Sequence, residues 1–216
     1  TMLAYFPEKT IRIGVEPAKN IDWSALDKSI KIVNDYFSGK SLKPLLKEKK
    51  VKSFTCCAMF YDLEDPNSFV SDIKNLLAED GVWCIQISYL VLMIKNLNFY
   101  DICNEHLEYY SLQTLSNLMQ KHGLEIFDAE TNAVNGGSLR AYISHKNNRE
   151  KSENLKKLLQ IEEEMNLYDA QTYENFYAEM EDLSTKVRSY LLNEIKNNNK
   201  VLGLGASTKG NVLLQF

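Results

Sequence analysis

The chain has few of the side chains that bind transition metals or form disulfides, with only four cysteines and three histidines among 216 residues. The cysteines stand at Cys56, Cys57, Cys84 and Cys103, and no two of them have C-x-x-C spacing. The sequence therefore predicts no metal site and no disulfide framework. Buried thiols in a reducing environment are expected instead, which predicts a cytoplasmic location.

Long apolar runs and an excess of basic residues are also missing. The longest apolar run, residues 89–94, is far shorter than the roughly 20 residues that a membrane-spanning helix needs. No charged and then apolar segment opens the chain as a secretory signal would. The net charge of −4 argues against a phosphate-backbone partner. We expect no membrane and no nucleic-acid partner, and the sequence leaves the oligomeric state open.

What remains is an ordinary globular composition, 44% hydrophobic and 25% charged, with a regular order of elements. Apolar segments bounded by turn residues predict strands at 11–16, 29–33, 53–59, 82–87, 124–127 and 138–143. Helices are predicted after Asp65-Pro66 and after Ser111, where a capping residue precedes a helical apolar pattern, and a turn is predicted at Asp80-Gly81. Strands that alternate with helices indicate an α/β fold, with a mostly parallel sheet covered on both faces.

The character of the chain changes to helix at residues 149–200. Two apolar stripes, one from Leu155 to Met165 and one from Phe176 to Ile195, predict packing faces, and the glutamates at 162–164 predict a solvated face. Residues 201–211 predict a strand, a glycine-rich turn and a helix start. Backbone N–H groups there, with Ser207 and Lys209, could hold a phosphate, although a tight strand-to-helix turn explains the glycines equally well.

Two positions carry candidate chemistry. His106 follows Glu105 and precedes two tyrosines, and an imidazole accepts a proton near neutral pH with the least tuning, so it is the leading candidate for a general base. The alternative is a packed histidine on a half-buried helix. Glu16 ends a predicted strand, where doubly wound folds place the carboxylate that binds the ribose of a nucleotide. The alternative is a surface glutamate before a proline.

Five ordered motifs resemble the class I S-adenosylmethionine-dependent C-methyltransferases that act on nucleotide-linked deoxysugars. They lie at residues 14–20, 58–66, 105–111, 135–140 and 205–211, and together they extend over nearly the whole chain. The resemblance implies an incomplete doubly wound Rossmann-like methyltransferase sheet at 1–148, a helical connector at 149–200, and the start of a C-terminal Rossmann-like sugar-nucleotide domain at 201–216. It also implies that the family's zinc-binding N-terminal module and its glycine-rich cofactor motif precede residue 1.

The resemblance further implies roles for individual residues. His106 would remove a proton beside a keto group to give an enolate, and Glu105 would orient or polarise neighbouring groups. Cys103 and Asn104 occupy places where the family has tyrosine or cysteine and then histidine, and Asp62 stands where some members have histidine. The S-adenosyl-L-methionine site would comprise Glu16 at the ribose, Asn34 or Asp35 at the adenine, and Ala58, Met59 and Phe60 at the methionine. Ser207, Lys209 and Asn211 would approach the diphosphate of the sugar nucleotide.

Two other function classes stay open on the sequence alone. A nicotinamide-dependent oxidoreductase shares the sheet and the acidic strand end, and the turn expected before residue 1 would discriminate between them. A non-catalytic module is the second. If the strand that carries the cofactor loop precedes residue 1, we expect the 216-residue chain alone to be marginally stable and inactive, and to associate through uncovered sheet edges.

Overall fold

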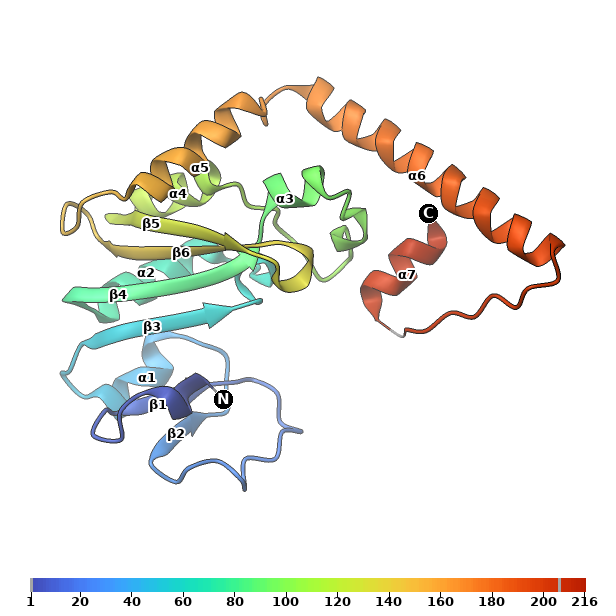
Figure 1. The fold of residues 1–216 in the computed structure, drawn as a ribbon. Helices are drawn as coiled ribbons and strands as arrows, with labels where there is room; N and C mark the ends of the chain where they lie inside the picture. Colours follow the sequence, from blue (N-terminus) through green and yellow to red (C-terminus); the bar gives the residue numbers. More distant parts are fainter. Residues whose placement is uncertain (1, 206) are drawn as a thin grey trace.

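The computed structural model describes residues 2–205 and 207–216, and it forms two sheets flanked by helices (Figure 1). β1 (Arg12–Val15) pairs with β2 (Ile30–Val33) in a two-stranded sheet. The other sheet has four strands in the order β3 (Val51–Cys57), β4 (Leu77–Ser88), β6 (Ser138–His145) and β5 (Leu124–Asn132). Within the described residues, β1, β2, β3 and β5 each leave one edge unpaired.

One strand departs from the expectation of a mostly parallel sheet: β6 runs against β3, β4 and β5, which share one direction. β1 with β2 and β3 with β4 are parallel, whereas β6 is antiparallel to both β4 and β5. Only residues 133–137, which include the short 3-10 helix η4 (Val134–Gly136), connect β5 to β6. A parallel neighbour would need a crossover of a dozen or more residues. A connection this short therefore requires an antiparallel hairpin.

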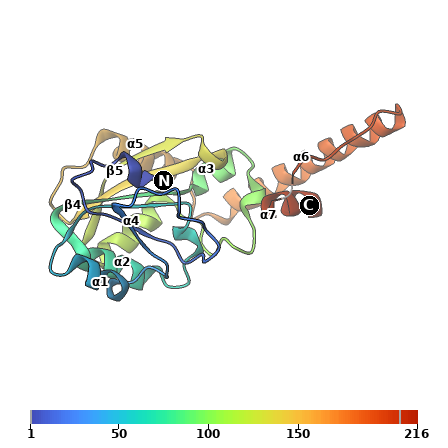
Figure 2. The ribbon, with the colours of Figure 1, turned by 90° about the horizontal axis from the view of Figure 1, so that it is seen from below.

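The two faces of the four-stranded sheet differ, so the expectation of cover on both faces is wrong for the described chain. α1 (Gly39–Leu46), α2 (Pro66–Leu76) and α4 (Leu112–Lys121) lie on one side of the strands (Figure 2). On β4, Trp83, Ile85 and Ile87 are fully buried in the core on alternate positions. The side chains between them belong to the other face, where Gln86 accepts hydrogen bonds from half-buried Arg140. A polar face of this kind does not require an apolar cover.

The predicted helix starts are confirmed. The Asp65 side chain accepts a hydrogen bond from Ser68 N, with Pro66 in the first turn of α2. Ser111 and Thr114 form a reciprocal capping box at the start of α4. The predicted turn at Asp80-Gly81 is wrong, because both residues lie within β4. Val51 of β3 pairs with Leu77 of β4, but Ser53 pairs with Val82, so β4 has extra residues between these two pairs. They form a bulge-like irregularity within the strand and do not end it.

Glu162 on α5 (Glu153–Glu164) is buried, which corrects the prediction of a solvated face at this residue. Its carboxylate accepts hydrogen bonds from the backbone N–H groups of Leu112 and Gln113 and from the Tyr89 hydroxyl. The first N–H groups of a helix have no partner within the helix. Glu162 therefore supplies, from a remote helix, acceptors that α4 lacks. Its neighbours Glu163 and Glu164 are exposed, as predicted.

The C-terminal part of the chain extends from the sheet as α6 (Ala170–Lys196), followed by α7 (Thr208–Gln215) (Figure 1). Of the predicted apolar stripe on α6, Phe176 and Met180 are buried, but Val187, Tyr190 and Ile195 are exposed. The strand predicted from residue 201 is absent from the described residues 201–205, where Leu202 and Leu204 are exposed and no neighbouring strand offers hydrogen bonds. No helix within 2–205 or 207–216 is long and apolar enough to cross a membrane.

Short elements complete the chain and position the site. η1 (Met2–Tyr5) precedes β1, η2 (Phe60–Asp62) follows β3, and α3 (Leu90–Lys95) and η3 (Phe99–Asp101) follow β4. α7 packs against η3, although more than 100 residues separate them in the sequence.

Candidate active site

Glu105 and His106 lie in a loop between η3 and α4, so the alternative of a histidine on a half-buried helix does not apply. The loop is bound to η2: the backbone N–H groups of Leu107 and Glu108 both donate to the Tyr61 carbonyl, at 3.0 and 3.1 Å. Within the loop, His106 N donates to the Cys103 carbonyl at 3.1 Å. These bonds place the Glu-His pair directly beside the turn that follows β3.

The imidazole of His106 is half-buried among aromatic rings. Its centroid lies 4.4 Å from the Tyr61 ring and 6.4 Å from the Tyr109 ring. Burial raises the pKa of Asp62, the next residue after Tyr61, while His106 lowers it and Glu105 raises it further. Asp62 is therefore within electrostatic reach of both predicted catalytic residues. The rings hold the imidazole in one place, which is the positioning that a general base requires.

Glu105 connects the loop to α7. Its carboxylate is exposed, and its pKa is held below the usual value first by its own backbone N–H and then by Thr208, Cys103 and His106. Burial raises the pKa of the Cys103 thiol, which stays protonated at neutral pH. The thiol is therefore a weak, neutral hydrogen-bond donor next to Glu105.

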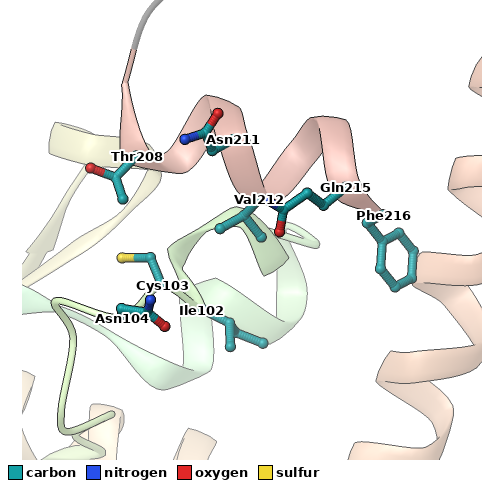
Figure 3. Close-up of a pocket in the computed structure, with 8 residues that line it drawn as sticks. All are labelled: Ile102, Cys103, Asn104, Thr208, Asn211, Val212, Gln215 and Phe216. Carbon is teal, nitrogen blue, oxygen red and sulfur yellow. The ribbon is translucent and has the colours of Figure 1, made fainter.

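A pocket of about 380 Å³ separates this loop from α7 (Figure 3). The loop contributes Cys103 and Asn104, and α7 contributes Asn211. The remaining lining residues are Ile102, Thr208, Val212, Gln215 and Phe216. Side-chain amides from both walls and apolar groups between them give the pocket the mixed character of a small-molecule site.

Two of the three residues predicted to approach a diphosphate have partners within the protein. The Ser207 hydroxyl accepts a hydrogen bond from Gly210 N at 3.1 Å and caps α7. Lys209 forms an ion pair with Asp101 on η3. The predicted glycine-rich loop also includes residue 206, which lies outside the described residues. Of the three, Asn211 is the one among the residues that line the pocket.

The predicted nucleotide-binding residues form a separate group at the carboxyl ends of β1 and β2. Glu16 is half-buried, and its Oε1 accepts a hydrogen bond from Ala18 N at 2.9 Å. The Asn34 amide donates to the carbonyls of Glu16 and Ala18, at 2.7 and 2.8 Å, and so binds the two strand ends together. Asp35 is exposed, and its carboxylate accepts from Tyr36 N.

The segment predicted to border the methionine group follows β3. β3 ends at Cys57, two residues earlier than predicted. The next residue, Ala58, has a positive φ of 53°, and its backbone N–H donates to the Gln86 carbonyl. Met59 is half-buried. The Phe60 ring is completely buried against Trp83 and Tyr110, so only the backbone of Phe60 is left to contact a ligand.

Sequence reasoning did not single out Tyr61, Asp101 or Thr208 as site residues. Tyr61 had a usable signal, because it follows the end of a predicted strand, where parallel sheets place their ligand sites. Asp101 had none, because its partner Lys209 lies 108 residues further along the chain. Thr208 reaches Glu105 only because α7 folds back onto η3.

Comparison with known proteins gives matches to C-methyltransferases. Residues 133–216 match the family described as the C-methyltransferase C-terminal domain. C-methyltransferase NovU from Streptomyces niveus is 28% identical over 207 residues, which cover 94% of this chain and 49% of that protein. The chain therefore spans about half the length of this curated relative.

Two solved structures resemble the chain at low sequence identity. The first is a complex between the Trm112 methyltransferase activator of Haloferax volcanii and a methyltransferase, with a TM-score of 0.50, 12% identity, and cover of 62% of this chain and 72% of that one. The second is the 1,6-didemethyltoxoflavin-N1-methyltransferase of Burkholderia thailandensis, with a TM-score of 0.45, 10% identity, and cover of 62% and 60%. Similarity at this level concerns the fold alone, and the first of these structures supports the predicted α/β, Rossmann-like fold class.

Proposed function

We propose that this chain is part of an S-adenosylmethionine-dependent C-methyltransferase that methylates a carbon of a nucleotide-linked keto-deoxysugar. The observation that carries the proposal is the position of the Glu105–His106 pair: His106 packs on Tyr61 in the turn after β3, and Glu105 interacts with Thr208 at the start of α7. Similarity to a C-methyltransferase along 94% of the chain supports methyl transfer over hydride transfer. The proposal includes a cytoplasmic location, which the four free cysteines support.

In this proposal His106 is the general base. A C–H bond beside a keto group is acidic because the electron pair left behind moves onto the keto oxygen as an enolate. His106 takes that proton, and the enolate carbon then forms a bond to the methyl group of S-adenosylmethionine as the carbon–sulfur bond breaks. Glu105 stands next to the base and orients it or polarises the sugar. The Cys103 thiol contributes at most a weak hydrogen bond to the enolate.

The residues at the ends of β1 and β2 fit the nucleoside part of S-adenosylmethionine. Among the described residues, the Glu16 carboxylate accepts one hydrogen bond, at Oε1, so it retains acceptor capacity for two ribose hydroxyls. Asn34 holds the two strand ends in place and Asp35 lies exposed beside it, at the adenine side. Ala58, Met59 and the Phe60 backbone border the methionine part.

We assign the sugar nucleotide to the pocket between α7 and the loop at residues 102–111, which carries Glu105 and His106 and is called the catalytic loop below. Asn104 and Asn211 belong to opposite walls of the pocket, and the first turn of α7 presents backbone N–H groups. Ser207 and Lys209 complete the predicted diphosphate side. Because Lys209 is paired with Asp101, it would have to exchange partners to contact a phosphate.

The proposal is tested by separating proton removal from methyl transfer in the complete protein. Nucleotide-linked 4-keto-deoxysugars are incubated with the enzyme in D₂O, once with S-adenosylhomocysteine and once with S-adenosylmethionine. We expect deuterium at the carbon beside the ketone in the first case and a new C-methyl group in the second. If no keto-sugar nucleotide exchanges a proton or gains a methyl group, the proposed substrate class is wrong.

A further inference from the structure

Asp101 on η3 is a buried charged residue that contacts both α7 and the loop carrying Glu105 and His106. Its side chain is only 3% exposed, and its carboxylate pairs with Lys209. A buried carboxylate is costly unless a cation and hydrogen bonds compensate for the lost water. The position of Asp101 is therefore coupled to α7, which comes from the far end of the chain.

The surroundings of the pair show that α7 docks around it. The Lys209 ammonium lies 5.9 Å from the centroid of the Tyr100 ring, next to Asp101 in η3. The Phe216 ring lies 4.9 Å from the Phe99 ring, and Val212 packs against the small cluster around Phe99. Apolar contacts thus hold α7 against η3, and the ion pair sets which part of α7 faces the loop.

The backbone of Asp101 in turn anchors both ends of the catalytic loop. Its carbonyl accepts from Cys103 N at 3.0 Å and from the Tyr109 hydroxyl at 3.4 Å. Cys103 then accepts from His106 N. A displacement of Asp101 is therefore transmitted through one or two hydrogen bonds to His106.

We propose that Lys209 is a positioning residue for the Glu105–His106 loop and acts through Asp101. Through this contact α7 helps to fix the position of His106, in addition to its proposed part in substrate binding. The effect on catalysis rests on the function proposed above, whereas the effect on the loop does not. The rival role for Lys209, a direct ligand of the diphosphate, makes different predictions for the same variants.

The two roles are separated by a double-mutant cycle. Lys209→Met leaves the Asp101 carboxylate buried without its cation, which should loosen the loop. Asp101→Asn combined with Lys209→Met removes both charges and should restore the loop. Lys209→Arg keeps the cation and should resemble the wild type. Lys52→Met is the matched control, because Lys52 and Asp80 form an ion pair in which both side chains are 70% exposed.

The loop is followed by amide hydrogen exchange of Leu107 and Glu108, whose N–H groups bind the Tyr61 carbonyl. We expect exchange roughly tenfold faster in Lys209→Met, near wild-type exchange in the double variant, and no change in the control. Unchanged exchange in Lys209→Met, or equally fast exchange in the double variant, overturns the proposal. This measurement needs no turnover, so its failure leaves the proposed function untouched.

The kinetic arm uses the complete enzyme with a keto-sugar nucleotide. A positioning role predicts that Lys209→Met lowers kcat about tenfold with little change in the KM of the sugar nucleotide, and that the double variant recovers kcat. A diphosphate ligand predicts a raised KM in both variants. That second result overturns the positioning role. Absence of methyl transfer in the wild type would instead reject the proposed function while leaving the exchange result intact.

Discussion

The ring of Tyr61 lies 4.4 Å from the imidazole of His106, centroid to centroid, with the two planes tilted by 50°. The carbonyl of the same tyrosine accepts the N–H groups of the two residues that follow His106. One residue of η2 thus restrains both the side chain and the backbone of the candidate base. Positioning of this kind matters because proton transfer requires the base within hydrogen-bond reach of the substrate.

We expect the ring of Tyr61, and not its hydroxyl, to be needed for methyl transfer. Tyr61→Phe keeps the ring contact and should retain activity within a few-fold, whereas Tyr61→Leu removes the aromatic face and should lower kcat by about tenfold. Steady-state kinetics of the complete enzyme measure both, with thermal unfolding as the check on folding. Equal activity of the two variants would show that the ring does not position His106.

His106→Asn should abolish turnover while S-adenosylmethionine binding stays nearly unchanged. A positioned base typically contributes about 10²–10⁴-fold, and asparagine cannot take the proton. Methyl transfer and calorimetric cofactor binding are measured on the same preparation. His122→Asn serves as the control, because His122 follows α4 and contacts Asn67, away from the loop. Methyl transfer within tenfold of the wild type excludes His106 as the base.

Glu16→Ala should weaken S-adenosylmethionine binding by about 1.5–3 kcal/mol, the usual contribution of hydrogen bonds to a charged group. The sugar nucleotide should bind as before, because its proposed pocket is lined by the catalytic loop and α7. Isothermal titration with each ligand gives both affinities. The exposed Glu8 provides the matched control as Glu8→Ala. If Glu16→Ala leaves the affinity for S-adenosylmethionine unchanged, Glu16 does not bind the ribose and is a surface carboxylate.

Glu162→Gln should lower the free energy of unfolding by about 1–3 kcal/mol, because the buried carboxylate accepts two backbone N–H groups and a hydroxyl. The negative charge also interacts favourably with the start of α4. Urea denaturation of the chain measures the change. Glu163→Gln on the exposed face of α5 should change stability by less than about 0.5 kcal/mol. Similar values for the two variants would show that the cap contributes little.

Local features of the fold were predictable because their causes lie within a few residues. Asp65 and Pro66 start α2, and Ser111 starts α4, since capping side chains bond to the N–H groups of the next turn. The order of strands and helices predicted the α/β class for the same reason. Within the site, the Glu105–His106 pair stood out because both residues are adjacent in the sequence. Cys103, Asn104 and Asn211 were singled out by resemblance, and only the structure shows that all three line one pocket.

The errors concern partners that are distant in the sequence. Glu162 seemed a surface residue because its partners Leu112 and Gln113 lie about 50 residues earlier. The strand predicted from residue 201 does not form in the described residues, because a strand needs a neighbour and local apolar residues do not supply one.

The amino-acid sequence by itself determined the helix starts, the class of fold and the residue types available for chemistry, since these depend on short-range hydrogen bonding and periodicity. Only the tertiary structure decided that β6 runs antiparallel between β4 and β5, and that Tyr61 packs on His106. It also decided that Lys209 meets Asp101 across 108 residues. The physical reason is that a charge, ring or strand edge is satisfied by whichever partner the folded chain brings near, and that choice depends on the packing of the whole chain.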